Sequence, residues 1–186
     1  MAVTQPTVFT IGHSNRDLDE FLELLFEHSI RHVVDVRKLP GSKRYPQFNA
    51  DTLGEQLSQQ GIELSRSEGL TGRRNVSKEI AFEVNAWWQN RSFHNYADHA
   101  LSTEFRRALS ELDDTARAQP TAIMCSEAVW WRCHRRIIAD YLLVADYRVE
   151  HIMGPGQLMT AELSHGATPQ SDDSIVYPRS NDTIEE

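Results

Sequence analysis

Short apolar runs alternate along the chain with segments whose apolar residues recur every three or four positions. The short runs are rich in β-branched residues, which is typical of buried strands. They lie at Thr7–Ile11, His32–Val36, Ile62–Ser65, Thr121–Met124 and Tyr147–Met153. Because the segments between them have helical spacing, the pattern predicts an α/β fold. We expect three layers, with a mostly parallel sheet of about five strands and helices on both faces.

The helical segments are those in which the apolar residues fall on one face. They are Leu18–Leu25, a segment carrying Leu53 and Leu57, and the segments Ile80–Trp88, Phe105–Leu112 and Ile137–Ala145. The aromatic and polar stretch 88–97 fits neither the strand nor the helix pattern.

The pattern changes after Gly154-Pro155-Gly156. Residues 164–186 lack apolar periodicity and are rich in Ser, Thr, Asp and Pro, a composition typical of segments that bury little surface. We therefore predict a single α/β domain over residues 1–160 and a poorly ordered or loosely packed tail over residues 161–186.

The formal net charge is -8, and 40% of the residues are hydrophobic, which is typical of a globular chain. This charge argues against broad nucleic-acid binding, which needs a basic face, but it leaves open a small basic pocket that contacts nucleic acid. No apolar run approaches the roughly 18 residues that span a bilayer, so no membrane partner is expected. Two cysteines eight positions apart do not make a disulfide framework, which favours free thiols in a cytoplasmic protein.

Polar residues follow several of the predicted strands. Gly12-His13-Ser14 follows the first strand, Asp35 and Arg37 end the second, and Cys125 and Glu127 follow the strand that begins at residue 121. In open parallel sheets, ligands bind beyond the carboxyl ends of the strands. We therefore expect these three groups to meet at one edge of the sheet.

The segment Met124–Arg136 concentrates reactive side chains. It holds both cysteines, one carboxylate, one histidine, two tryptophans and three arginines. A loop that serves only as a connection is usually short and rich in Gly, Pro, Asn or Asp. The bulky and charged composition of this loop therefore indicates a site.

Four sequence blocks have a family counterpart. They are Thr10-Ile11-Gly12-His13-Ser14, Asp35-Val36-Arg37 with Pro40 and Ser42, Pro46-Gln47-Phe48-Asn49, and Met124-Cys125-Ser126-Glu127 through Cys133-His134-Arg135. From about Thr10 to Ile152 the chain resembles the family catalogued as domain of unknown function 488 (DUF 488). The resemblance implies the family's fold, a site at these blocks and a small intracellular protein, but no particular reaction.

Two positions depart from the family pattern. Ser126 stands where Ala is usual, and Leu70-Thr71-Gly72-Arg73-Arg74 stands where a Leu-Gly-Gly-Arg-Arg form is commoner. Neither departure removes a reactive group.

Four side chains are candidates for catalysis. Cys125 could be a small buried residue or, near His134 and the arginines of its loop, a thiolate nucleophile. Glu127 could act as a general acid or base, or form a salt bridge to a neighbouring arginine. His13 and His134 could transfer a proton, although a capping or solvated histidine is equally compatible with the pattern.

The candidate binding residues are mostly arginines, because the guanidinium fork binds phosphate and carboxylate groups bidentately. They are Ser14, Asp35, Arg37, Arg44, Arg73, Trp131, Arg132 and Arg135. Asp35 and Arg37 could instead form a structural ion pair. Trp130 and Trp131 could stack on a base, but two consecutive side chains cannot both face one site.

Together these residues favour an enzyme, a hydrolase or transferase, that acts on a small anionic, nucleotide-like substrate or a modified base. Gly12 stands alone after the first strand, so there is no dinucleotide-binding fingerprint, and the cofactor and oligomeric state are left open. One alternative is a non-catalytic module that senses a nucleotide or nucleic acid. Another is a thiol redox or metal-binding protein that uses Cys125 and Cys133, although their spacing is unusual for zinc and we assign no metal ligand.

Overall fold

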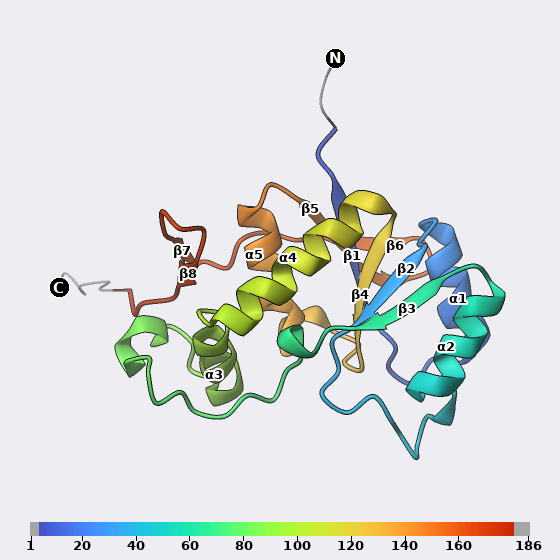
Figure 1. Ribbon diagram of the computed structural model, residues 1–186, viewed down its shortest axis with the longest axis horizontal. Helices are drawn as coiled ribbons and strands as arrows, with labels where there is room; N and C mark the ends of the chain where they lie inside the picture. Colours follow the sequence, from blue (N-terminus) through green and yellow to red (C-terminus); the bar gives the residue numbers. More distant parts are fainter. Residues whose placement is uncertain (1–3, 181–186) are drawn as a thin grey trace.

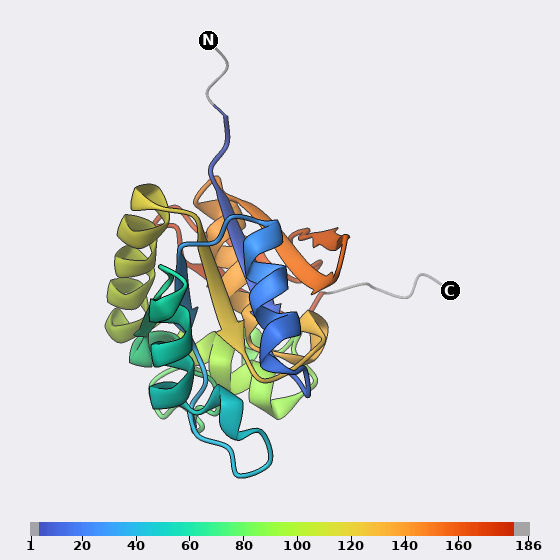
Figure 2. The same cartoon turned by 90° about the vertical axis from the view of Figure 1, so that its right-hand side faces the viewer.

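The computed structural model describes residues 4–180, and a six-stranded sheet forms its centre (Figure 1, Figure 2). The strands are β1 (Thr7–Gly12), β2 (His32–Asp35), β3 (Glu63–Arg66), β4 (Thr121–Cys125), β5 (Arg148–Gly154) and β6 (Gln157–Thr160). Their order is β3-β2-β4-β1-β5-β6, and only β6 pairs antiparallel with its neighbour. The mostly parallel sheet is confirmed, and β6 adds a sixth strand at its edge. A short hairpin of β7 (Thr168–Pro169) and β8 (Ile175–Val176) lies outside this sheet.

Within residues 4–180, five α-helices cover the two faces of the sheet. They are α1 (Leu18–Glu27), α2 (Ala50–Gln59), α3 (Arg91–His99), α4 (Thr103–Ala118) and α5 (Arg135–Val144). Helices α1 and α2 lie on one face, and α3, α4 and α5 lie on the other (Figure 1, Figure 2). Each face buries its own hydrophobic cluster, so the predicted three-layer fold is confirmed.

Strand β4 contributes alternate side chains to the two clusters. Ala122 and Met124 pack on the side of α1 and α2, whereas Ile123 and Cys125 belong to the cluster under α3, α4 and α5. Successive side chains of a strand point to opposite faces, which fixes this division. The last residue of β4 therefore places its thiol beside α5.

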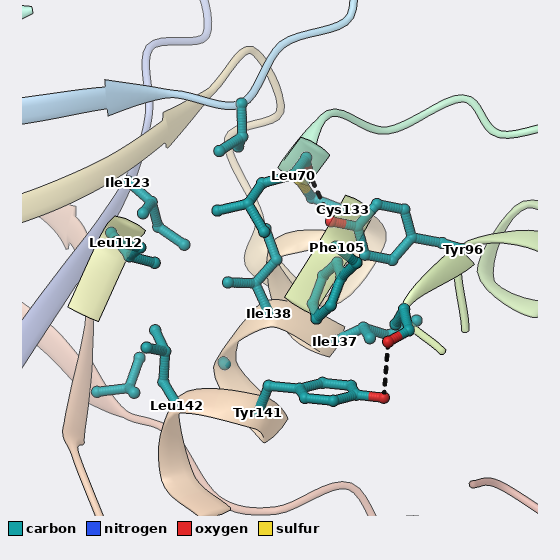
Figure 3. Packing of buried hydrophobic residues seen from close by; sticks show 14 of the residues in the cluster. Leu70, Tyr96, Phe105, Leu112, Ile123, Cys133, Ile137, Ile138, Tyr141 and Leu142 are labelled. Atoms are coloured by element: carbon teal, nitrogen blue, oxygen red, sulfur yellow. Dashed lines mark hydrogen bonds between the residues drawn. The ribbon is translucent and has the colours of Figure 1, made fainter. Parts of the chain in front are cut away.

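The second cysteine, Cys133, belongs to the hydrophobic cluster on the α5 side of the sheet. Cys133 lies at the start of α5, among Leu70, Tyr96 and Phe105 (Figure 3). The hydroxyl of the fully enclosed Tyr96 donates to the carbonyl of Leu70 at 2.7 Å, which joins α3 to the segment after β3. Cys133 is thus held by packing on one side while its sulfur remains at the carboxyl edge of the sheet.

The helix predicted over Ile80–Trp88 is wrong. A short 3-10 helix spans Phe82–Asn85, and the next α-helix, α3, begins only after Asn90. The cause is a tertiary contact: the N–H of Trp87 donates to the carbonyl of Tyr177, and the N–H of Tyr177 donates to the carbonyl of Val84. An α-helix would need these backbone groups for its own hydrogen bonds.

Within residues 161–180, where the sequence predicts a poorly ordered or loosely packed tail, Ala161, Ser164, Ile175 and Tyr177 are buried. Ile175 and Tyr177 are fully buried, and the Tyr177 hydroxyl donates to Asp140 Oδ2 at 2.8 Å. The other oxygen of Asp140 accepts the N–H of Ser164 at 2.9 Å. The buried and hydrogen-bonded residues of this segment are few and widely spaced. They therefore form no apolar periodicity from which their packing could be predicted. Residues 181–186 lie outside the described part of the chain.

Candidate functional site

The ends of β1, β2 and β4 meet at one edge of the sheet, as expected. The β1–β4 register pairs Gly12 with Cys125, and the N–H of His13 then donates to the Cys125 carbonyl at 2.9 Å. On the other side of β4, the N–H of Val36 donates to the carbonyl of Met124, also at 2.9 Å. Because β4 lies between β1 and β2, its loop takes the central place at this edge.

A cavity of about 360 Å³, which we call the thiol pocket, opens at this edge. The predicted site residues that line it are Arg37, Arg73, Cys125, Glu127, Arg132 and His134. Cys133, Lys38, Gly72 and Tyr96 also line it, although they were not among the candidate site residues. The pocket joins the loop after β2, the segment after β3, the start of α3 and the loop between β4 and α5.

His13, Asp35 and Arg135, described below, are not among the lining residues of the thiol pocket, and neither are Arg44, Trp131 and Ser14. Arg44 is exposed and lies over the ring of Tyr45, 5.5 Å from its centre. Trp131 is 43% exposed and packs edge-on against Trp130. Ser14 follows β1 but turns away with a positive φ of 50°, and its hydroxyl donates to Asn15. None of the three lines the cavity, so their predicted binding role is not supported by position.

The two cysteine sulfurs face each other at 2.9 Å, and both residues are free thiols. Burial raises the pKa of Cys125, and so do the hydrogen bond to Cys133 and the negative charge on Cys133. Burial would also raise the pKa of Cys133, but the hydrogen bond from Cys125, the charge of His134 and the charge of Arg135 together hold it well below its usual range. The contacts of Cys133 with His134 and with the N–H of Arg135 therefore favour Cys133 as the more acidic of the two thiols.

The imidazole of His134 is fixed between a carbonyl and a thiolate. Its Nε2 lies 3.1 Å from the carbonyl of Val36, to which it donates, and its Nδ1 lies 3.5 Å from the Cys133 sulfur. Gly72 leaves the space that the ring occupies, because a β-carbon there would come within 2.7 Å of Nδ1. Tyr96 packs against the same ring, with centroids 4.9 Å apart.

Arg135 does not reach into the pocket; it is 1% exposed and lies beneath the loop. Its Nη1 donates to the Thr10 hydroxyl at 2.9 Å, and its Nη2 donates to the Glu127 carbonyl at 2.7 Å. No ion pair joins it to a carboxylate of residues 4–180. Burial would lower the pKa of Arg135, but the negative charge of the cysteine pair outweighs it and raises that pKa. Since a buried cation needs a partner, the thiolate serves as its counter-ion.

The Arg135 side chain also orders a buried chain of polar groups. The Thr10 oxygen that accepts from Arg135 donates its own proton to His151 Nδ1 at 2.6 Å. His151 stacks on Trp130, with ring centroids 4.6 Å apart and planes within 4°. Burial lowers the pKa of His151 to about 3, and Arg135 adds to that effect. Trp130 is therefore part of the support of the loop.

Asp35 and Arg37 form a buried ion pair, which was one of the two roles expected for them. The guanidinium binds the carboxylate at 2.7 and 2.9 Å and donates to the Phe48 carbonyl at 2.7 Å. His13 lies behind this pair: its Nε2 accepts from Arg37 at 3.3 Å, and its Nδ1 donates to the Ser14 carbonyl. Burial lowers the pKa of His13 to about 4. His13 therefore positions Arg37 and lies outside the pocket lining.

Glu127 is exposed and has no ion-pair partner within residues 4–180, so the salt bridge that was one of its two possible roles is absent there. Glu127 lines the thiol pocket, and its backbone carbonyl accepts from Arg135. The Cys125 sulfur lies 3.7 Å from the same carbonyl. An unpaired carboxylate beside a thiolate is available to accept a proton from a substrate or from water.

Three cations of the pocket wall are also unpaired in the described part of the chain. Lys38, Arg73 and Arg132 are exposed and have no carboxylate within ion-pair distance. Arg73 adopts a positive φ of 56°, a conformation that costs a non-glycine residue some strain. Lys38 and Arg73 also line a second cavity of about 360 Å³ next to the thiol pocket. The two cavities therefore share a cationic wall.

Sequence patterns missed several residues of the pocket. Gly72 lies within a block that differs from the family form, and its small size is its contribution. Asn90 and Tyr96 fall in the stretch that fitted neither pattern, although Asn90 caps α3 by accepting the N–H groups of Ser92 and Phe93. An Asn followed by a periodic aromatic segment was the signal that could have located this helix.

Within residues 4–180, no group of three or more His, Cys, Asp or Glu side chains is placed to hold a metal ion. Within the same range, no helix combines the length and the apolar character that crossing a bilayer requires.

Fold and site together define a three-layer α/β protein with a dithiol and a cationic wall at the carboxyl edge of its sheet. A family model described as Domain of unknown function DUF488 matches residues 17–142, which is more than half of the chain, and the protein belongs to this family. The resemblance carried by the sequence blocks is thus confirmed. No curated protein and no solved structure matches the chain.

Proposed function

We propose that this protein is a hydrolase or transferase that acts on a small anionic, nucleotide-like substrate in the thiol pocket. The observation that carries the proposal is the position of Cys133, whose pKa is lowered, in the same cavity as Lys38, Arg73 and Arg132, three cations without a carboxylate partner within residues 4–180. A thiolate is the reactive form of cysteine, and forked guanidinium groups bind phosphate or carboxylate.

The residues divide into distinct roles. Arg73 and Arg132 hold the anionic group, and Cys133 attacks the electrophilic atom of the substrate to form a covalent bond through sulfur. His134, whose Nδ1 lies 3.5 Å from the Cys133 sulfur, gives a proton to the leaving group. The exposed carboxylate of Glu127 then removes a proton from water or from an acceptor molecule, whose attack releases the product and restores the thiolate. The sequence predicts Cys125 as the nucleophile. Because the pKa of Cys125 is raised and that of Cys133 is lowered, we assign this role to Cys133 instead.

The size of the substrate is limited by the two adjoining cavities. The thiol pocket has room for a small group, and the second cavity continues beyond Lys38 and Arg73. A nucleoside phosphate is large enough to place its phosphate on the shared cationic wall and its ring in one of the two cavities. The protein's net charge of -8 is compatible with this, because the cations are local.

Binding tests the proposal first. Thermal-shift and calorimetric titrations with nucleoside mono-, di- and triphosphates and with pyrophosphate should identify a ligand, and Arg73→Ala and Arg132→Ala should each weaken its binding about tenfold, as expected for one charge-assisted hydrogen bond. Arg44→Ala is the matched control, because Arg44 is an exposed arginine outside the pocket. An equal loss in Arg44→Ala would contradict the assigned site.

Product analysis then separates an enzyme from a sensor. Cys133→Ala should keep the binding and lose the turnover, because the cations remain while the nucleophile is gone. Binding by the unmodified protein without any product would instead support the non-catalytic alternative. Failure of the whole panel to bind would overturn the proposed substrate class.

A further inference from the structure

The two thiols of the pocket are placed for a reaction with each other. Cys125 ends β4, Cys133 precedes α5, and their sulfur atoms lie 2.9 Å apart without a bond. A disulfide bond is about 2.05 Å long, so its formation needs the sulfurs to approach by only about 0.9 Å. Two free cysteines in such contact differ from a lone buried cysteine, which has no partner to react with.

The two sulfurs have different surroundings, so each can act in a different one of two successive steps. Cys133 accepts the N–H of Arg135 at 3.4 Å and lies beside His134, so several donors surround its sulfur. Cys125 instead donates its proton to the Cys133 sulfur at 2.9 Å, and the carbonyl of Glu127 lies farther away, at 3.7 Å. One sulfur is thus prepared to attack, and the other keeps a proton that can leave in a second step.

Cys125 and Cys133 both line a cavity that a small molecule can enter. The thiol pocket has a volume of about 360 Å³, and its lining includes Cys125 and Cys133 together. The cations of its wall would stabilise negative charge that develops on an oxygen leaving the sulfur. A hydroperoxide is small enough to reach this position, and it supplies the oxidising equivalents that a dithiol needs to close.

We propose that Cys133 and Cys125 form a reversible redox centre in which a hydroperoxide oxidises the pair to an intramolecular disulfide. The pair is then a site of modification, with Cys133 as the residue that meets the oxidant and Cys125 as the residue that resolves the product. The proposal goes beyond the hydrolase or transferase function and does not depend on it, since it needs no nucleotide-like substrate.

The two steps balance in atoms and electrons. The Cys133 thiolate attacks the outer oxygen of the hydroperoxide, the O–O bond breaks, and the remaining alkoxide leaves as an alcohol with a proton from His134. Cys133 is then a sulfenic acid. The Cys125 sulfur attacks the Cys133 sulfur, the S–O bond breaks, and the hydroxyl leaves with the Cys125 proton as water. The two thiols lose two electrons, and the peroxide gains them.

Oxidation has a consequence for the buried charge nearby. Closing the disulfide removes the thiolate that serves as the counter-ion of Arg135, which has no carboxylate partner within residues 4–180. Arg135 also holds the Glu127 carbonyl, so the loop that shapes the pocket lies directly next to the altered charge. The oxidised and reduced proteins should therefore differ in the thiol pocket as well as in the bond itself.

Intact mass spectrometry and thiol titration test the proposal on the full chain. The reduced protein, treated with an equimolar amount of hydrogen peroxide, should lose two hydrogens and both free thiols, and dithiothreitol should restore both. Cys125→Ser should instead gain one oxygen and bind the sulfenic-acid reagent dimedone, because no resolving thiol remains. Cys133→Ser should react at least about tenfold more slowly than Cys125→Ser.

A second test uses the unmodified protein and therefore does not require the cysteine variants to fold. In the unmodified protein, a substoichiometric amount of iodoacetamide at neutral pH should label Cys133 before Cys125, as peptide mapping would detect. Oxygen addition without loss of two hydrogens, disulfides only between molecules, or preferential labelling of Cys125 would each overturn the proposal. Since none of these measurements uses a nucleotide, their outcome is separate from that of the proposed function.

Discussion

Gly72 packs against the imidazole of His134, and a β-carbon at position 72 would lie 2.7 Å from Nδ1. Gly72→Ala should therefore push the ring away from the Cys133 sulfur and lengthen the 3.1 Å hydrogen bond to Val36. Loss of the nearby imidazole charge should raise the pKa of Cys133. The alkylation rate measured from pH 5 to pH 9 should then have its midpoint at a higher pH in the variant.

Gly41→Ala is the matched control for that measurement. The nearest atom to a β-carbon at Gly41 is Asn49 Oδ1 at 3.8 Å, which is ordinary contact. Its pH–rate profile should coincide with that of the unmodified protein. If Gly72→Ala also left the profile unchanged, His134 would have no part in lowering the pKa of Cys133.

For single residues, the sequence was sufficient to predict several of the side chains that lie at the site, but it was not sufficient to predict what each of them does. The loop containing Cys125, Glu127 and His134 was identified from its composition, and all three line the pocket. The choice of Cys133 over Cys125 as the thiolate depends on which sulfur lies near His134 and the N–H of Arg135, and spacing alone contains no such distances. The same limit explains why Arg44 and Trp131 were included although they lie outside the cavity.

The loop that follows β4 packs closely against Gly12, the last residue of β1. A β-carbon at Gly12 would come within 1.8 Å of the Glu127 carbonyl oxygen, which also accepts from Arg135. Gly12→Ala should therefore force the β4–α5 loop away from β1 and lower the free energy of unfolding by about 2 kcal/mol or more, because overpacking a rigid contact is destabilising. Urea denaturation of the variant measures this change.

Gly54→Ala in α2 is a control with the opposite expected sign. Its added β-carbon would meet only Leu64 Cδ2 at 3.7 Å. Alanine is a better helix former than glycine, so this variant should gain about 0.5–1 kcal/mol. Equal stability of Gly12→Ala and the unmodified protein would mean that the loop can move away from β1 without cost.

Helices were predicted correctly where their own apolar spacing determines the structure. A prediction failed where the backbone forms hydrogen bonds with a segment far away in the sequence. Helix α1 follows the spacing of its buried residues, such as Phe21 and Leu25. The segment 80–88 has apolar residues at similar spacing, but the hydrogen bonds between Trp87, Val84 and Tyr177 replace its helix. That partner lies about ninety residues further along the chain, in a tail whose composition indicated little packing.

For the whole molecule, alternating strands and helices were enough to predict the layers, because each element must bury an apolar face. The strand order was not predicted from the sequence. Strand β4 inserts between β1 and β2, and this insertion places Cys125 next to His13 and Val36. The rule that ligands bind at the carboxyl edge predicted the meeting of the loops without specifying which strand lies in the centre.

The stability of the whole molecule should depend on pH through its buried neutral imidazoles. Burial lowers the pKa of His13 to about 4, whereas an unfolded histidine has a pKa of about 6.5. Between these two values the unfolded chain binds a proton at His13 and the folded chain does not, so lowering the pH favours unfolding. For His13 alone, the loss should reach about 3 kcal/mol by pH 4. His151, with a pKa lowered to about 3, acts in the same direction.

Replacing His13 by Asn isolates this contribution. His13→Asn should be less stable at pH 7, because it loses the stacking of the imidazole on Phe48 at 4.3 Å. Its free energy of unfolding, from urea denaturation between pH 7 and pH 4.5, should nevertheless decline less steeply, by up to about 1.4 kcal/mol per pH unit. His165→Gln, at an exposed position, should keep the slope of the unmodified protein. Parallel slopes for His13→Asn and the unmodified protein would mean that the His13 ring gains its proton without unfolding, and the ring would then be reachable from the pocket after all.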